Sequence, residues 1–96
     1  MMKLIGKDKI AQFSRKHSRA RKPLEMWVLK TENAVWENSA DVKATFPTVD
    51  NPGDFYIFNI SGNKYRLVAI VAIKNGLVIV NRIMTHAEYD EWNKRR

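Results

Sequence analysis

The sequence predicts a small α+β domain, and three observations lead to this fold class. Two stretches with helical periodicity, Lys7 to Ser18 and Pro23 to about Trp36, come early in the chain. Runs rich in β-branched and aromatic residues then fill most of Phe55 to Thr85. A capping-box pattern at Thr85 begins a final short helix. Helices followed by neighbouring strands are typical of α+β domains, and we expect residues 1–96 to form one domain.

Each early helix has an apolar face that can pack on a sheet. The second helix is expected to bury four apolar side chains, Leu24, Trp27, Val28 and Val35. Pro23 suits its first position, because the N–H that proline lacks would have no partner there. We also expect a short edge strand at residues 2–5 and a turn capped by Ser39 or Asp41.

The dipeptide Asn75-Gly76 lies between two apolar strand-type runs and predicts a two-residue type I′ hairpin turn. Such a turn would pair Lys74 with Leu77 and, further along the strands, Arg66 with Thr85. Because side chains alternate across a sheet, this register decides which polar groups can meet.

The expected register gathers polar side chains at one end of one sheet face. They are Lys64, Arg66, Asn81 and Thr85. In the same register Arg82 points to the opposite face, which is otherwise apolar. The polar end is therefore the best candidate site in the sequence.

The net charge of +7 is unevenly distributed. Residues 1–30 hold nine Lys or Arg and two acids, and they include a basic block made of Arg15, Lys16, Arg19, Arg21 and Lys22. This pattern suggests a polyanionic partner such as RNA, since each neutralised phosphate releases counterions. Two other interpretations of the charge remain: a basic surface that only aids solubility, and an acidic protein partner.

Several classes of protein are not expected. The chain has no cysteine, which excludes disulfides and thiolate metal sites. No apolar run approaches the ~18 residues of a membrane span, and the first ten residues lack a signal peptide's apolar stretch, so we expect a cytoplasmic protein without membrane contact. Asp50 and Asp54 suit an exposed turn better than a metal site, and we expect no metal or other cofactor.

The capping box places His86 at the first position of the last helix, where Thr85 and Glu88 exchange hydrogen bonds. The positive end of the helix dipole and the neighbouring cations should keep the imidazole of His86 neutral near pH 7. A neutral imidazole beside Arg66 could abstract a proton from a ribose 2′-hydroxyl. The alternative is a histidine that only packs at a helix start.

Two motif blocks in order, GNKYRLV at 62–68 and THAEYD at 85–90, follow the strand FYIFNI at 55–60. Together with an upstream layout of Pro23-Leu24, Trp27, Trp36 and Asp41-Val42-Lys43, they resemble the HigB family of toxins, in the RelE-like superfamily of type II toxin–antitoxin systems. The resemblance implies a small RelE-like domain: an antiparallel sheet, two N-terminal helices packed on one face, and a short C-terminal helix. The other face would be a concave RNA site.

The resemblance also implies a ribosome-dependent endonuclease that cuts messenger RNA without a metal and inhibits translation and growth. The cognate antitoxin would be a HigA-like helix-turn-helix protein, and the toxin would bind operator DNA only through this antitoxin. Arg66, His86 and Tyr89 would be catalytic. Asn63 and Lys64, beside the turn, would contact RNA. Asn81 and Arg82 would also contact RNA, and the basic block would dock on ribosomal RNA.

The sequence departs from the family's pattern at one position. The family carries an arginine five residues before the motif histidine, where this chain has Asn81, followed by Arg82. Either a β-bulge turns Arg82 over to the site, or the site has one arginine fewer. The second possibility keeps open an alternative function, a weakly active or inactive module that binds RNA or the antitoxin.

Overall fold

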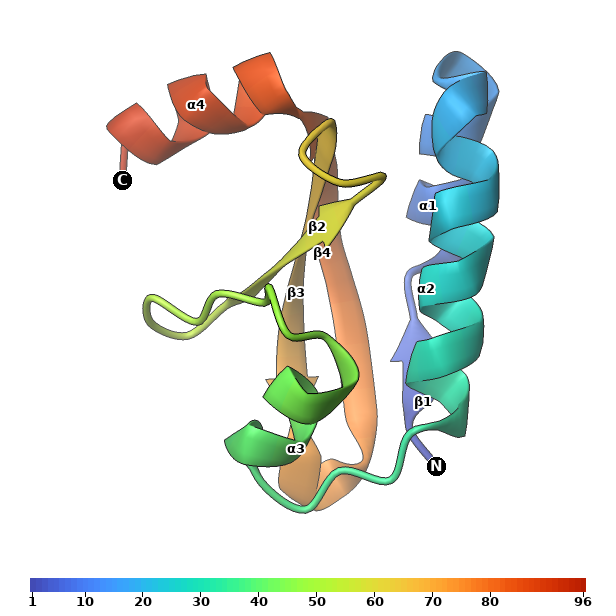
Figure 1. Cartoon of the computed structure of the whole chain (residues 1–96), viewed down its shortest axis with the longest axis vertical. Coiled ribbons are helices and arrows are strands. Elements are labelled where there is room, and N and C mark those ends of the chain that lie inside the picture. The colour runs from blue at the N-terminus through green and yellow to red at the C-terminus, as the bar shows by residue number, and fades with distance from the viewer.

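The computed structural model describes residues 1–96 and contains one four-stranded sheet with helices on both of its faces (Figure 1). The elements follow in the order β1 (Lys3–Ile5), α1 (Lys7–Lys16), a 3₁₀ turn η1 (Ser18–Ala20), α2 (Arg21–Asn33), α3 (Ser39–Thr45), β2 (Tyr56–Ile60), β3 (Tyr65–Ala72), a second 3₁₀ turn η2 (Ile73–Asn75), β4 (Leu77–Thr85) and α4 (His86–Lys94). The predicted α+β class is confirmed. No helix has the length and apolar character that crossing a membrane requires.

The sheet has the strand order β1-β4-β3-β2. As expected, β2, β3 and β4 are antiparallel, but β1 runs parallel to β4, so the sheet is mixed rather than wholly antiparallel. A parallel neighbour needs a long crossover, which α1, α2 and the rest of the chain supply. Because β1 has three residues, it pairs only with Leu77–Ile79 and leaves the rest of that edge of β4 without a strand.

Helices α1 and α2 cover one face of the sheet (Figure 1), where the main core lies. Helix α2 begins at Arg21 rather than Pro23, because η1 leads directly into it, and it ends at Asn33. Trp36 therefore reaches the core from the following loop, whereas Val35 is 70% exposed, contrary to the sequence prediction. The cap of α3 is Asn38, whose side chain accepts from the Asp41 N–H, instead of Ser39 or Asp41.

The turn between β3 and β4 differs from the predicted type I′ turn. A type I′ turn needs positive φ at both central residues. Here Gly76 has a φ of 65°, but Asn75 belongs to η2 and has a negative φ. The turn thus spans four residues, and Ala72 pairs with Leu77. This shift of two residues keeps each side chain near the turn on its predicted face.

A β-bulge at Asn81 changes the alternation further along the hairpin. Ala69 pairs with Val80, whereas the preceding residue, Val68, pairs with Arg82, so Asn81 has no partner on β3. One extra residue on one strand reverses the faces of all the residues beyond it. The bulged alternative for this strand is thereby confirmed, and the regular register is wrong.

The bulge decides which side chains accompany Arg66. Arg66 pairs with Met84, so Met84 and Arg82 lie on its face of the sheet, which we call the site face. Ile83 and Thr85 lie on the opposite face, toward the main core, although the unbulged register would put them beside Arg66.

Helix α4 lies on the opposite side of the sheet from α1 and α2 (Figure 1). Its Tyr89 and Trp92 pack on a small second core of Ile57, Val68 and Met84. The face that the resemblance left open to RNA is therefore partly covered by α4.

Candidate nucleic-acid interface

Arg66 is held in place by the turn that precedes its own strand. Its Nη1 donates to the main-chain oxygens of Asn63 (3.3 Å) and Tyr65 (3.2 Å), and its Nη2 donates to the Asn63 side-chain oxygen. A guanidinium has five N–H donors. These three bonds leave the Nε–H and one Nη2–H, which together form the side edge that suits two oxygens of a phosphate.

Two arginines of the site face lie against aromatic rings of α4. The Arg66 guanidinium carbon is 5.3 Å from the centre of the Tyr89 ring, and that of Arg82 is 5.5 Å from the centre of the Trp92 ring. Such cation–π contacts are worth about 0.5–1 kcal/mol at exposed sites. Arg66 is only 9% exposed, whereas Arg82 is exposed.

Asn81 lies at the bulge and contacts Arg82. Its side-chain oxygen accepts from the Arg82 Nε at 3.1 Å, and its main-chain oxygen accepts from Lys9 Nζ at 3.0 Å. The residue that seemed to replace an arginine thus orients the arginine that follows it. Lys64 is exposed next to the turn, and its main-chain oxygen accepts from the His86 N–H at 2.9 Å.

The capping box at the start of α4 is present as predicted, with Glu88 and Thr85 bonded reciprocally. It holds His86 at the same end of the hairpin as Arg66, because Tyr65 pairs with Thr85. The imidazole is about half exposed, and its Nε2 lies 3.5 Å from the Asp90 carboxylate, one turn further along α4. Its polar partner is therefore Asp90 rather than Arg66.

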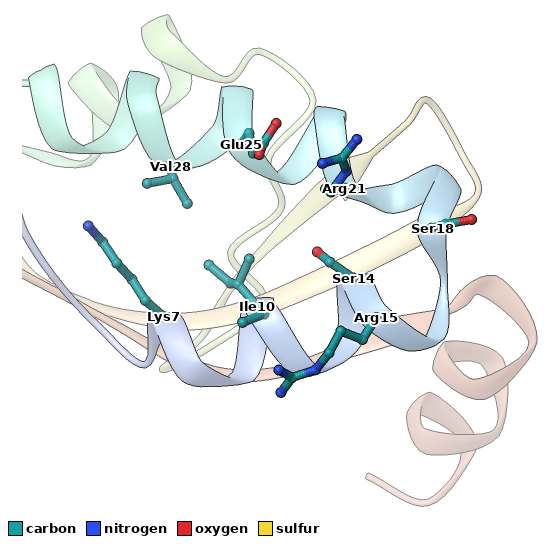
Figure 2. A pocket seen from close by; sticks show the side chains of 9 residues that line it. Lys7, Ile10, Ser14, Arg15, Ser18, Arg21, Glu25 and Val28 are labelled. Carbon is teal, nitrogen blue, oxygen red and sulfur yellow. The ribbon is translucent and has the colours of Figure 1, made fainter.

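The basic block is divided between different surfaces. Arg15 and Arg21 line a groove of about 580 Å³ between α1 and α2, with an apolar floor that includes Ile10 and Val28 (Figure 2). This is the largest hollow of the molecule, but it lies on the helical side, away from the site face. An apolar floor suits a protein segment better than RNA.

Lys16 contributes to a different hollow, of about 370 Å³, at the open edge of β4. Its lining residues include Lys9, Asn81 and Arg82. Positive charge thus continues from the site face across this edge to α1. The remaining members of the block, Arg19 and Lys22, are exposed and line neither hollow.

Three features of this interface were not predicted from the sequence. Asn63, expected to contact RNA, is bonded to Arg66; Asp90 accompanies His86; and Trp92 joins Tyr89 above the sheet. Two of them had a helical signal, since Asp90 follows His86 by four residues and Trp92 follows Tyr89 by three. The bond from Arg66 to Asn63 had no such signal, because it depends on the conformation of a turn.

Residues 20–92 match the model of a family described as HigB toxin, the RelE-like toxic component of a toxin–antitoxin system. The matched range contains the hairpin, the bulge and nearly all of α4. The chain belongs to the HigB toxin family.

Individual members of this family are moderately similar to the chain. The mRNA interferase toxin HigB of Escherichia coli (strain K12) is 40% identical over 52 residues, which are 51% of this chain and 50% of that protein. The mRNA interferase HigB of Shigella flexneri matches to the same extent. The mRNA interferase HigB of Escherichia coli O6:H1 is 25% identical over 93 residues, 94% of this chain and 90% of that protein. The chain spans about half the length of the first two relatives.

Proposed function

We propose that this chain is the toxin of a toxin–antitoxin pair and that it cuts messenger RNA bound to the ribosome, thereby stopping translation and growth in the cytoplasm. The relatives' names as mRNA interferases support the reaction class. The observation that carries the proposal is the bulge at Asn81, which brings Arg82 to the face of Arg66. Two arginines on one sheet face form a platform for adjacent phosphates.

The reaction is attack by a ribose 2′-hydroxyl on the adjacent phosphorus. The 2′-oxygen forms a bond to phosphorus and the bond from phosphorus to the 5′-oxygen breaks, leaving a 2′,3′-cyclic phosphate and a 5′-hydroxyl. Arg66 stabilises negative charge on the phosphoryl oxygens through its free Nε–H and Nη2–H, with Lys64 nearby. Asn63 holds the guanidinium in position for this contact.

Proton transfer is assigned to α4. His86 takes the proton from the 2′-hydroxyl, and Tyr89, whose ring lies against Arg66, gives a proton to the departing 5′-oxygen. The reaction as written needs no metal ion, since arginine supplies the positive charge at the phosphate. No group of three or more His, Cys, Asp or Glu side chains in the chain is arranged so that it could hold a metal ion.

Access to the substrate on the ribosome would depend on the basic surface, with ribosomal RNA as the docking partner. The antitoxin would be a HigA-like helix-turn-helix protein, and operator DNA would be bound through it alone. The competing function, a weakly active or inactive module that binds RNA or the antitoxin, rested on Asn81 in place of an arginine. The bulge weakens that argument, because Arg82 faces the site.

Induction in growing bacteria tests this proposal. The wild-type chain should stop growth and shorten messenger RNA, and co-expression of the antitoxin encoded beside it should restore both. If the induced protein is folded and yet growth and messenger RNA stay intact, the binding-module function is the better one.

A further inference from the structure

Trp92 on α4, which the catalytic scheme does not use, is the centre of an aromatic and cationic cluster. Its ring centre lies 5.5 Å from the guanidinium carbon of Arg82 and 4.8 Å from that of Arg96. The rings of Phe55 and Tyr89 are each 6.0 Å away. Trp92 is half-buried, so part of its ring is accessible.

Beside this ring is a hollow of about 460 Å³ between β4 and α4. It is lined by Arg82, Ile83, Met84, Glu88, Glu91, Trp92 and Arg95. The space thus has an aromatic wall, an apolar strand behind it and arginines at its borders. A planar, partly apolar group attached to an anion would match these walls.

The two carboxylates in the lining already have partners. Glu88 accepts from the Thr85 N–H at 2.8 Å in the capping box. Glu91 lies 3.9 Å from both Lys94 and Arg95. Both carboxylates thus have polar partners within the chain, and the same lining sets two arginines, Arg82 and Arg95, against these two negative charges.

The hollow adjoins the arginine platform. Arg66 pairs with Met84, so Arg82 is its diagonal neighbour, and the Cα atoms of such neighbours lie roughly 7–8 Å apart across a sheet. This is about the separation of successive phosphates in an extended single strand. An RNA with one phosphate at Arg66 would have the next at Arg82, with the attached base at Trp92.

We propose that this hollow binds one nucleobase of single-stranded RNA, stacked on Trp92, with the phosphate of the same nucleotide on Arg82. The proposal rests on the proposed function for the presence of RNA on this face, and it adds a subsite next to the cut. Arg96, the other arginine against this ring, is exposed, has Asn93 as its only side-chain hydrogen-bond partner and does not line the hollow, so it leaves the hollow side of Trp92 open to a base. Stacking tolerates any base, because every base offers a flat face.

Intrinsic fluorescence can detect this contact directly. Trp27 and Trp36 are 2% and 5% exposed, so among the three tryptophans only Trp92 can meet a ligand. The probe is a hexanucleotide RNA with 2′-O-methyl groups, which cannot be cut by 2′-hydroxyl attack. Titration into the wild-type chain should give saturable quenching, and Trp92→Phe should abolish this quenching.

Affinity is measured in parallel by the anisotropy of the same RNA carrying a fluorescent label. Trp92→Ala should weaken binding roughly 5- to 150-fold, the range for losing one stacked base. Trp92→Phe retains a ring and should stay close to wild type. Leu29→Ala, an exposed apolar residue on α2, is the matched control and should change nothing.

Two results would overturn the inference: no quenching at the highest soluble RNA concentration, or equal RNA affinities of Trp92→Ala and wild type. Quenching by the antitoxin but not by RNA would also overturn it, because this result would assign the hollow to a protein partner. The proposed function is judged separately by cleavage. A wild-type chain that binds RNA through Trp92 but cuts none would retain this subsite and refute the nuclease.

Discussion

Asn63 and Arg66 are joined by two hydrogen bonds, one to the main-chain oxygen and one to the side-chain oxygen of Asn63. These bonds occupy the outer end of the guanidinium and leave its side edge for a phosphate. Asn63 belongs to the turn between β2 and β3, where Ser61 and Gly62 both have positive φ. The conformation of this turn therefore determines how Arg66 is presented.

If Asn63 positions Arg66, its replacement should slow cleavage without removing the charge. We expect Asn63→Ala to reduce the cleavage rate on programmed ribosomes, by less than the 10²- to 10³-fold loss typical of removing an oxyanion stabiliser itself. Asn63→Asp keeps both acceptor oxygens and should retain more activity than Asn63→Ala. Equal rates for Asn63→Ala and wild type would show that the turn does not matter for Arg66.

The bulge makes a prediction about Arg82 that a regular strand does not. With Arg82 on the site face, Arg82→Ala should lower the cleavage rate in the manner of Arg66→Ala, with little effect on thermal unfolding, since its side chain is exposed. Lys74→Ala removes an exposed charge at the other end of the hairpin and serves as the control. A variant that unfolds more easily but cuts normally would place Arg82 outside the site.

The sequence predicted the elements of the fold better than their pairing. The helices, strands β2 to β4 and the capping box follow from periodicity and local signals, and all of them are present. The predicted type of hairpin turn was wrong. Asn-Gly allows positive φ at both positions but does not require it, and here η2 extends the turn through Asn75. The sequence left the bulge at Asn81 as one of two alternatives, because the alternation of apolar and polar residues along a strand contains no local signal for an extra residue.

The candidate site was predicted only in part, because part of it depends on the strand pairing that the sequence did not determine. Arg66 and His86 come to one end of the hairpin, as their places in the two motifs suggested. The position of Arg82 depended on the bulge. The covering of the site face by Tyr89 and Trp92 depended on the direction of α4 after β4, which is set by tertiary packing.

His86 is tested together with its neighbour Asp90. As the base, His86 should contribute roughly 10²- to 10⁴-fold, so His86→Ala should lose that much in cleavage rate. Asp90→Asn removes the carboxylate 3.5 Å from the imidazole and should have a smaller effect. Near-normal cleavage by folded His86→Ala would assign this histidine to packing at the helix start.

The division of the basic block predicts two separable effects. Replacing Lys16, Arg19 and Lys22 by glutamine should weaken ribosome binding and flatten its dependence on salt. The same change at Arg15 and Arg21, which line the apolar groove between α1 and α2, should affect ribosome binding less. Binding is measured by co-sedimentation over a range of salt concentrations. An equal response of the two variants would show that the block acts as one surface.

Catalysis by Arg66 is tested most directly by mapping the 5′ ends of messenger RNA after induction of the wild-type chain and of Arg66→Ala. Thermal unfolding must first show that the variant is folded, because Arg66 is largely buried. If Arg66 stabilises the charge at the phosphate, wild type should produce new ends with 5′-hydroxyls inside translated regions, and Arg66→Ala should lose these ends. The same new ends in both would contradict it, as would a wild-type chain that produces none.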